Sequence, residues 1–142
     1  MREILFRGKR TDNCEWLYGY YFFENINLYA NFNGCHYVHP CGQNQALSVI
    51  PETVGQYTGL TDKNGKRIFE GDVVKYKNTD GIKFNGVALT VIGKVVYNEK
   101  NASFAISGKD EIGAKHYDYF PIKNIEIVGN IHDNPELLKG GD

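Results

Sequence analysis

Apolar and polar residues alternate in short runs along most of this chain, and turn-forming residues separate the runs at intervals of about ten residues. Alternation with a period of two is typical of strands that bury one face. β-branched and aromatic side chains, which favour strands, dominate the clearest runs. We therefore expect a mainly β protein, built as a small barrel or sandwich. The expected strands are 3–10, 15–24, 28–30, 37–39, 46–50, 57–60, 68–69, 73–76, 86–97, 103–107, 117–120 and 125–131.

Glycine and asparagine mark the expected turns. Asn64 and Gly65 predict a two-residue hairpin turn of type I′, because that turn needs a positive φ at both central residues. Gly71 predicts a tight corner, and Gly93 predicts a bulge or bend inside a strand. The polar stretches 78–81 and 108–113 predict loops.

One helical turn is expected near the C-terminus. Asn134 suits the N-cap, Pro135 the first helical position and Gly140 the end. So short a helix needs tertiary contacts to persist. At the N-terminal end of the expected barrel, Pro51 interrupts strand pairing. The chain becomes rich in glycine and aspartate after it, so we predict a boundary at 50–53.

Composition narrows the class of protein. The chain has 142 residues, with 16 Lys and Arg against 17 Asp and Glu, and its net charge of −1 argues against a globally basic nucleic-acid-binding protein. No apolar run is long enough for a membrane span or a signal peptide, so we expect a cytoplasmic protein with no membrane partner. In that compartment Cys14, Cys35 and Cys41 are expected to be reduced.

Charge is distributed unevenly along the chain. Residues 1–60 carry 4 basic and 5 acidic side chains, residues 61–123 carry 11 and 8, and residues 124–142 carry 1 and 4. The expected barrel is therefore mildly basic and the tail acidic. Either the surface is mixed and solvated, or the acidic tail docks on the basic barrel, including that of a neighbouring subunit.

The segment from Cys35 to Cys41 contains two cysteines and two histidines, which are zinc-binding side chains. Adjacent Cys35 and His36 point to opposite sides of an extended chain, and no CxxC pair is present. We therefore expect a turn with small cysteines and surface histidines, and no cofactor. If a metal did bind, the candidate ligands would be Cys35, His36, His39 and Cys41.

Nucleophilic catalysis needs a nucleophile, a base and an orienting acid that meet in space. Cys14, His116 or His132, and Asp118 or Asp133 supply those types, but nothing in their spacing requires them to meet. The sequence contains none of the common phosphate-binding, zinc-protease or serine-hydrolase motifs. We expect no enzymatic activity.

Two segments are candidates for contact with a partner. Trp16 and Tyr18 begin a strand rich in aromatic residues, which is typical of a core or a subunit interface. The alternative is base stacking, but no basic residue follows this strand before Lys63. Lys63, Lys66 and Arg67 cluster at the expected hairpin tip, either as solvated charges or as a phosphate-contacting tip.

Several motifs, taken in order, make the chain similar to the YopX family of phage and prophage proteins. They are MREILFR (1–7), WLYG (16–19), PETVGQYTGL (51–60), DKNGKRIFEGDVV (62–74), GKVVY (93–97) and IVGNIHDNPELL (127–138). The resemblance implies an SH3-like β-barrel after residue 53, a homo-oligomer, and a phage or prophage protein in the cytoplasm of a bacterial host. It supplies no activity and no catalytic residue.

Together these observations predict three parts: an N-terminal β-rich region (1–53), an SH3-like β-barrel (54–134) and a C-terminal helical turn and tail (135–142). The expected function is that of a non-enzymatic, oligomeric binding module with a host or phage protein as partner. One alternative is a nucleic-acid-binding accessory protein that uses the basic face of the barrel, by analogy with other such barrels. A small enzyme is the second alternative.

Overall fold

The computed structural model describes residues 1–24 and 35–139. The chain divides into two compact units, Met1–Gly59 and Leu60–Asp142. The strands form two antiparallel sheets, which confirms the expectation of a mainly β protein. Across the two described stretches, no helix has the length and apolar character needed to cross a membrane.

The first sheet has the strand order β4-β3-β2-β1-β5-β6. Its strands are β1 (Phe6–Lys9), β2 (Trp16–Glu24), β3 (Cys35–Pro40), β4 (Leu47–Ser48), β5 (Gly55–Thr61) and β6 (Arg67–Phe69). Val38 and Val49 are fully or almost fully buried in the first unit. A 3₁₀ turn, η1 (Pro51–Thr53), follows β4, and the strand expected at 28–30 lies outside the described residues.

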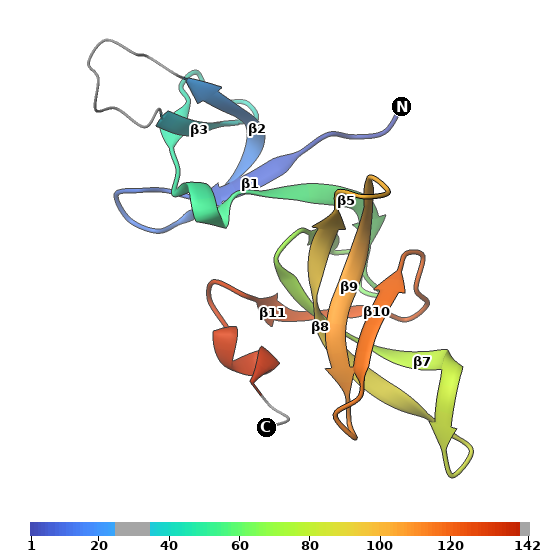
Figure 1. Cartoon of the computed structure of the whole chain (residues 1–142). Helices are drawn as coiled ribbons and strands as arrows, with labels where there is room; N and C mark the ends of the chain where they lie inside the picture. The colour runs from blue at the N-terminus through green and yellow to red at the C-terminus, as the bar shows by residue number, and fades with distance from the viewer. Residues whose placement is uncertain (25–34, 140–142) are drawn as a thin grey trace. The chain divides into compact units, whose positions relative to one another are not determined.

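The second sheet has the strand order β10-β9-β8-β7-β11 (Figure 1). Its strands are β7 (Asp72–Phe84), β8 (Val87–Asn98), β9 (Ser103–Asp110), β10 (Lys115–Tyr119) and β11 (Glu126–Asn130). Where the sequence predicts a C-terminal helical turn, the structure has a single 3₁₀ turn, η2 (Pro135–Leu138). The hydrophobic core of this unit contains Ile68, Val74, Tyr76, Val91, Val95, Ile106 and Ile125.

Of two stretches expected to be loops, 78–81 lies inside a strand, and of 108–113 only residues 108–110 do. Residues 78–81 lie inside β7, whose pairing with β8 shifts register between Asn78 and Lys83. A bulge absorbs the turn-forming residues there, so they do not end the strand. Likewise β9 continues to Asp110, because Gly108 and Lys109 pair with both neighbouring strands.

The hairpin at Gly65 differs from the expected type I′ turn. Gly65 has φ +80°, but Asn64 is not among the residues with positive φ. Gly65 N donates to Asp62 O at 3.0 Å, and Asp62 N donates to Lys66 O at 2.8 Å. This is the three-residue loop in which a type I turn is followed by a left-handed glycine.

The boundary between the units also differs from the expected one. Pro51 begins η1 rather than a domain boundary, and the next strand returns to the first unit. Gly55 pairs with Arg7 and Gln56 with Phe6, so the start of β5 extends the first sheet. Residues 54–59 therefore belong to the first unit, and the division falls between Gly59 and Leu60.

The described strands form no closed barrel, which corrects the expectation for 54–134, because β10 and β11 are the edges of the second sheet. The sheet is nevertheless tightly coiled at Gly93 and Gly108, which lie directly opposite each other. A Cβ atom on Gly108 would lie 2.2 Å from Ile92 O and 2.5 Å from Gly93 Cα. Only glycine permits so close an approach of two backbones.

Coiling brings together side chains from strands that are not neighbours. β7 and β10 are three strand spacings apart in the sheet, or about 14 Å if the sheet were flat. Yet Tyr76 Oη on β7 donates to Asp118 Oδ2 on β10, and Asn78 Nδ2 on β7 lies 3.0 Å from His116 Nδ1 on β10. These four residues form a polar seam, which closes the inner face of the sheet without a strand-to-strand contact.

The glycine pair yields a stability prediction. We expect Gly108→Ala to lower the free energy of unfolding by about 2 kcal/mol, since the added methyl group must push β8 and β9 apart. Ser107→Ala is the neighbouring control, because it adds no atom to the crowded backbone. Urea denaturation followed by circular dichroism measures both variants. Equal stability of Gly108→Ala and the parent protein would show that the sheet relaxes freely.

Candidate functional site

Lysines gather on one face of the second sheet. In the pairing of β8 with β9, Lys94 lies opposite Ser107 and Ile92 opposite Lys109. In the pairing of β9 with β10, Lys109 lies opposite Lys115. Directly paired residues project to the same face of a sheet, and here that face is turned away from the hydrophobic core. We refer to Lys94, Lys109 and Lys115 as the lysine face.

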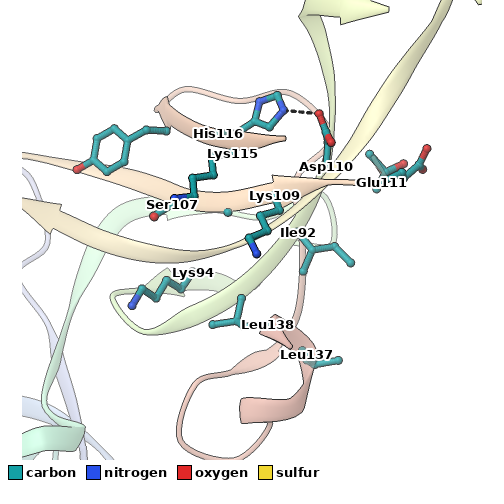
Figure 2. Close-up of a pocket in the computed structure, with 13 residues that line it drawn as sticks. Ile92, Lys94, Ser107, Lys109, Asp110, Glu111, Lys115, His116, Leu137 and Leu138 are labelled. Carbon is teal, nitrogen blue, oxygen red and sulfur yellow. Dashed lines mark hydrogen bonds and ion pairs between the residues drawn. The ribbon is translucent and has the colours of Figure 1, made fainter. Parts of the chain in front are cut away.

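A groove of about 690 Å³ lies over the lysine face. On its other side is η2, where Leu137 and Leu138 lie across from the sheet (Figure 2). Ile92 and Tyr117 add apolar and aromatic surface to the lining. The groove therefore combines ammonium groups with apolar surface, at a volume typical of ligand-binding pockets.

The lysines of this face have no acidic partner. In the part of the chain that the structure describes, no carboxylate oxygen lies within 4.0 Å of the Nζ atoms of Lys94, Lys109 or Lys115. Lys109 and Lys115 are moreover direct cross-strand neighbours, an arrangement in which like charges destabilise a sheet. The three ammonium groups thus have no ion pair of their own, while Glu111 is an exposed acidic residue in the lining of the same groove (Figure 2).

Several acidic side chains of the same unit are turned inward instead. Asp62 and Asp72 are only 6% and 2% exposed, and the Asp110 side chain is 3% exposed. Backbone N–H groups hold these carboxylates; Phe69 N, for example, donates to Asp72 Oδ2 at 2.8 Å. The outer surface of the unit is therefore more positive than the sequence charge alone indicates.

Of the expected catalytic set, the structure brings His116 and Asp118 together. His116 Nδ1 lies 3.7 Å from Asp118 Oδ2, and His116 Nε2 lies 2.8 Å from Asp110 Oδ2. The hydrogen bond from His116, with those from two backbone N–H groups, holds the pKa of Asp110 below its ordinary value. Burial and the hydrogen bond to Asp118 raise the pKa of Tyr76, which stays protonated as the donor. The contacts of His116 are with carboxylates and the Asn78 amide, so this cluster ties strands together.

The first unit presents a different surface. Tyr18, Tyr20 and Phe22 occupy alternate positions of β2 and are 46%, 60% and 42% exposed. Tyr37 on β3 lies opposite Phe22, and their rings stack with centroids 5.2 Å apart. We refer to these four residues as the aromatic face. Exposed aromatic side chains that share one face are typical of interaction surfaces.

Cationic side chains border the aromatic face, although no lysine or arginine follows β2 in the sequence before Lys63. Lys9 pairs with Trp16 and Arg7 with Tyr18 in the β1–β2 hairpin. Arg7 Cζ lies 4.7 Å and Lys9 Nζ 5.4 Å from the Trp16 ring centroid, within cation–π range. The sequence holds a signal for both residues: antiparallel pairing across the turn expected at 11–13 places the residues before the turn beside those after it.

The other expected interaction residues, at the hairpin tip, do not line the groove over the lysine face. Lys63 Nζ lies 3.1 Å from Glu126 Oε2, and Lys75 Nζ lies 3.7 Å from the same oxygen. The hydrogen bond and charge of Lys63, with the charge of Lys75, lower the pKa of Glu126. Lys66 donates its backbone N–H to Asp62, and Arg67 is exposed at the start of β6. Lys63 thus contributes an ion pair within this unit.

The segment from Cys35 to Cys41 forms β3 and the turn after it. His36 Nδ1 lies 2.7 Å from Tyr21 Oη, so this imidazole is engaged with β2. His39 pairs with Tyr20 and His36 with Phe23, so the two histidines lie on opposite faces of β3. Among the residues that the structure describes, no group of three or more His, Cys, Asp or Glu side chains is placed to hold a metal ion, and all three cysteines are free thiols.

Comparisons with known proteins identify one family. The family model described as YopX protein matches residues 5–139. No curated protein matches the chain. Among solved structures, the crystal structure of protein EF1440 from Enterococcus faecalis is 21% identical to this chain and has a TM-score of 0.48. The match covers 97% of this chain and 99% of the chain of EF1440.

Asp62 holds the hairpin that carries the predicted tip. Its Oδ1 accepts from Asn64 N and Lys66 N at 2.9 Å each, and its Oδ2 accepts from Ile127 N at 3.1 Å. Burial by itself raises the pKa of Asp62, but the three backbone donors and the charge of Lys66 outweigh it and lower the pKa below its ordinary value. The ionised carboxylate therefore joins the turn to β11.

We expect Asp62→Asn to lower the free energy of unfolding by about 2 kcal/mol at pH 7, since charge-assisted hydrogen bonds are lost. Because the folded-state pKa is depressed, this stabilisation is present above the unfolded pKa of about 3.9 and is lost as the pH falls through the folded pKa. The difference from the parent protein, measured by urea denaturation, should therefore shrink at pH 3.

The control is Asp12→Asn, which removes an exposed ion pair with Arg10 and should change stability little. An equal loss for Asp62→Asn at both pH values would mean that the carboxylate charge has no role in the turn.

Proposed function

The chain belongs to the YopX family, and from that premise we propose that it is a non-enzymatic binding module that works as a homo-oligomer, joined through the aromatic face of the first unit. The observation that carries the proposal is the exposure of Tyr18, Tyr20 and Phe22 on one side of β2. Aromatic residues are enriched at protein interfaces because they bury large apolar areas at low entropic cost.

The proposed partner on this face is a second copy of the chain. Lys9 lies beside Trp16 at one end of the face, and Glu24 ends β2 at the other. Glu24 is eight residue steps along the strand from Trp16, or about 26 Å. If two copies pack with their β2 strands antiparallel, the Glu24 of each lies over the Lys9 of the other. The face is thus self-complementary in charge, as a two-fold interface requires.

The aromatic face supplies about half of the buried surface that such an interface needs. Four half-exposed aromatic side chains bring about 400 Å² per copy, whereas a standard interface buries about 800 Å² per partner. The remaining area falls to the flanking residues of β1 and β3, which pair with β2 on both sides.

The rest of the proposal follows the resemblance to phage and prophage proteins. The assembly would act in the cytoplasm of a bacterial host on a host or phage protein. The SH3-like character of the second unit belongs to the same proposal, and its support is the coiled sheet closed by the polar seam. The proposal of no enzymatic activity is supported by the contacts of His116, which stabilise the fold.

Sedimentation velocity tests the oligomer. We expect the parent protein to sediment as an oligomer, and Tyr20→Glu and Phe22→Glu each to shift it to monomer at the same concentration, because a buried carboxylate opposes association. Tyr97→Glu is the matched control: Tyr97 is also exposed, at 43%, but lies on β8 of the second unit. A monomeric parent protein, or dissociation by Tyr97→Glu alone, would contradict the proposed interface.

A charge exchange tests the pairing itself. Lys9→Glu and Glu24→Lys should each weaken association severalfold, because like charges then meet across the interface. The double variant restores opposite charges and should recover association. If the double variant associates no better than the weaker single variant, the two copies do not pack with antiparallel β2 strands.

A further inference from the structure

We propose that the groove over the lysine face binds single-stranded nucleic acid, with phosphates on Lys94, Lys109 and Lys115 and a base against Tyr117. This site lies in the second unit and goes beyond self-association through the first. The net charge of the chain gives no indication of it, because acidic residues elsewhere balance the lysines. Asp62, Asp72 and Asp110 have buried carboxylates and the three lysines are exposed, while Glu111 is the exposed acidic residue of the groove lining.

The charge arrangement points to an anion. Lys109 and Lys115 face each other across two paired strands, and Lys94 lies on the same face one strand further on. A sheet gains nothing from such repulsion in the free protein. An anionic chain that contacts all three ammonium groups removes the repulsion and releases counterions, so binding and relief of repulsion act in the same direction.

The aromatic and apolar lining favours bases over an acidic peptide. Tyr117 is 46% exposed in the groove, and Tyr119 contacts its ring edge-on with centroids 5.6 Å apart. An edge contact fixes a ring while leaving a face free for stacking. Leu137 and Leu138 provide apolar surface across the groove. Cationic grooves with stacking aromatics are the common design of single-strand-binding proteins.

The size of the groove favours a single strand over a duplex. A volume of about 690 Å³, between a sheet and one 3₁₀ turn, suits a small number of nucleotides. A duplex has its bases paired inside and offers none to Tyr117. Stacking on an aromatic ring requires an unpaired base.

A second groove extends the cationic surface. It has a volume of about 730 Å³ and shares Thr90 with the first groove, so the two adjoin along β8. Its lining includes Lys63, Lys75, Lys77 and Lys123. Glu126 bonds with two of these lysines, but Lys77 has no ion pair in the described part of the chain. A strand longer than one groove would therefore meet further positive charge.

Fluorescence anisotropy of a labelled oligo(dT) strand, titrated with the full-length protein at several salt concentrations, tests the site. Three phosphate contacts predict that log K falls against log salt with a slope of about −2. We expect Lys94→Ala, Lys109→Ala and Lys115→Ala together to weaken binding more than tenfold at low salt and to flatten that slope. Each single lysine variant is compared with Lys100→Ala, which removes one positive charge outside both grooves and should bind like the parent protein.

Variants of Tyr117 separate stacking from charge. Tyr117→Ala should weaken oligo(dT) binding about tenfold while the salt slope stays the same, because a base loses its stacking partner but no phosphate contact changes. Tyr117→Phe keeps the ring and should bind like the parent protein. Thermal unfolding of each variant identifies any that loses its fold. If Tyr117→Ala does not fold, Tyr117→Phe is compared with the parent protein instead.

Three results would overturn the proposal. No retention of oligo(dT) at low salt means that the groove is not a nucleic-acid site. Equal affinity for the matching duplex, with Tyr117→Ala neutral, means that only the charge acts. Equal competition by poly-glutamate would assign the face to an acidic protein. None of these results bears on self-association, which Tyr20→Glu and sedimentation test separately.

Discussion

Gly93 and Gly108 lie face to face in the second sheet, and the shape of that unit depends on the absence of a side chain at both positions. Because the backbones approach so closely there, β8 and β9 coil instead of lying flat. Coiling brings the inner faces of β7 and β10 within reach of each other, and Tyr76 then donates to Asp118. A sheet whose edge strands are not paired together thus encloses a core by side-chain contact alone. The pair of glycines is the condition for the polar seam, and the seam completes the core.

Coiling also sorts the charges of the second unit. Residues on the inner face meet backbone donors or the seam, so carboxylates such as Asp110 are stable there as acceptors. Residues on the outer face meet solvent, and the alternation of β8, β9 and β10 places Lys94, Lys109 and Lys115 on it. A nearly neutral sequence therefore folds into a unit that gathers three lysines on one face of its sheet. Net charge describes solubility, whereas the distribution of charge determines which partners a surface can bind.

The sequence allowed prediction of the features that depend on local chemistry. Aromatic content identified β2, β-branched content identified β8, and glycine identified the corner at Gly71 and the bend at Gly93. The loop predicted at 78–81 was wrong, because β7 continues through a bulge between Asn78 and Lys83, both of which pair with β8. The two compact units divide after Gly59 and not near Pro51, since β5 pairs with β1, a strand distant in sequence. Contacts between distant strands are invisible to local patterns.

The same limit applies to the candidate sites. Lys63, Lys66 and Arg67 are close in sequence, and the structure gives Lys63 an ion pair with Glu126. The lysine face comes from three separate strands, so it follows only from the register of two pairings.

The two proposed surfaces lie on different units and make different demands on a partner. Their combination has a consequence that neither has alone. Three phosphate contacts give one groove only modest affinity, but an oligomer presents several grooves to one polymer. Once one groove is bound, the others meet the same strand at high effective concentration, and avidity rises steeply if the spacing allows both to engage. A weak site on each copy would then suffice for tight binding of a long single strand, and short strands would dissociate.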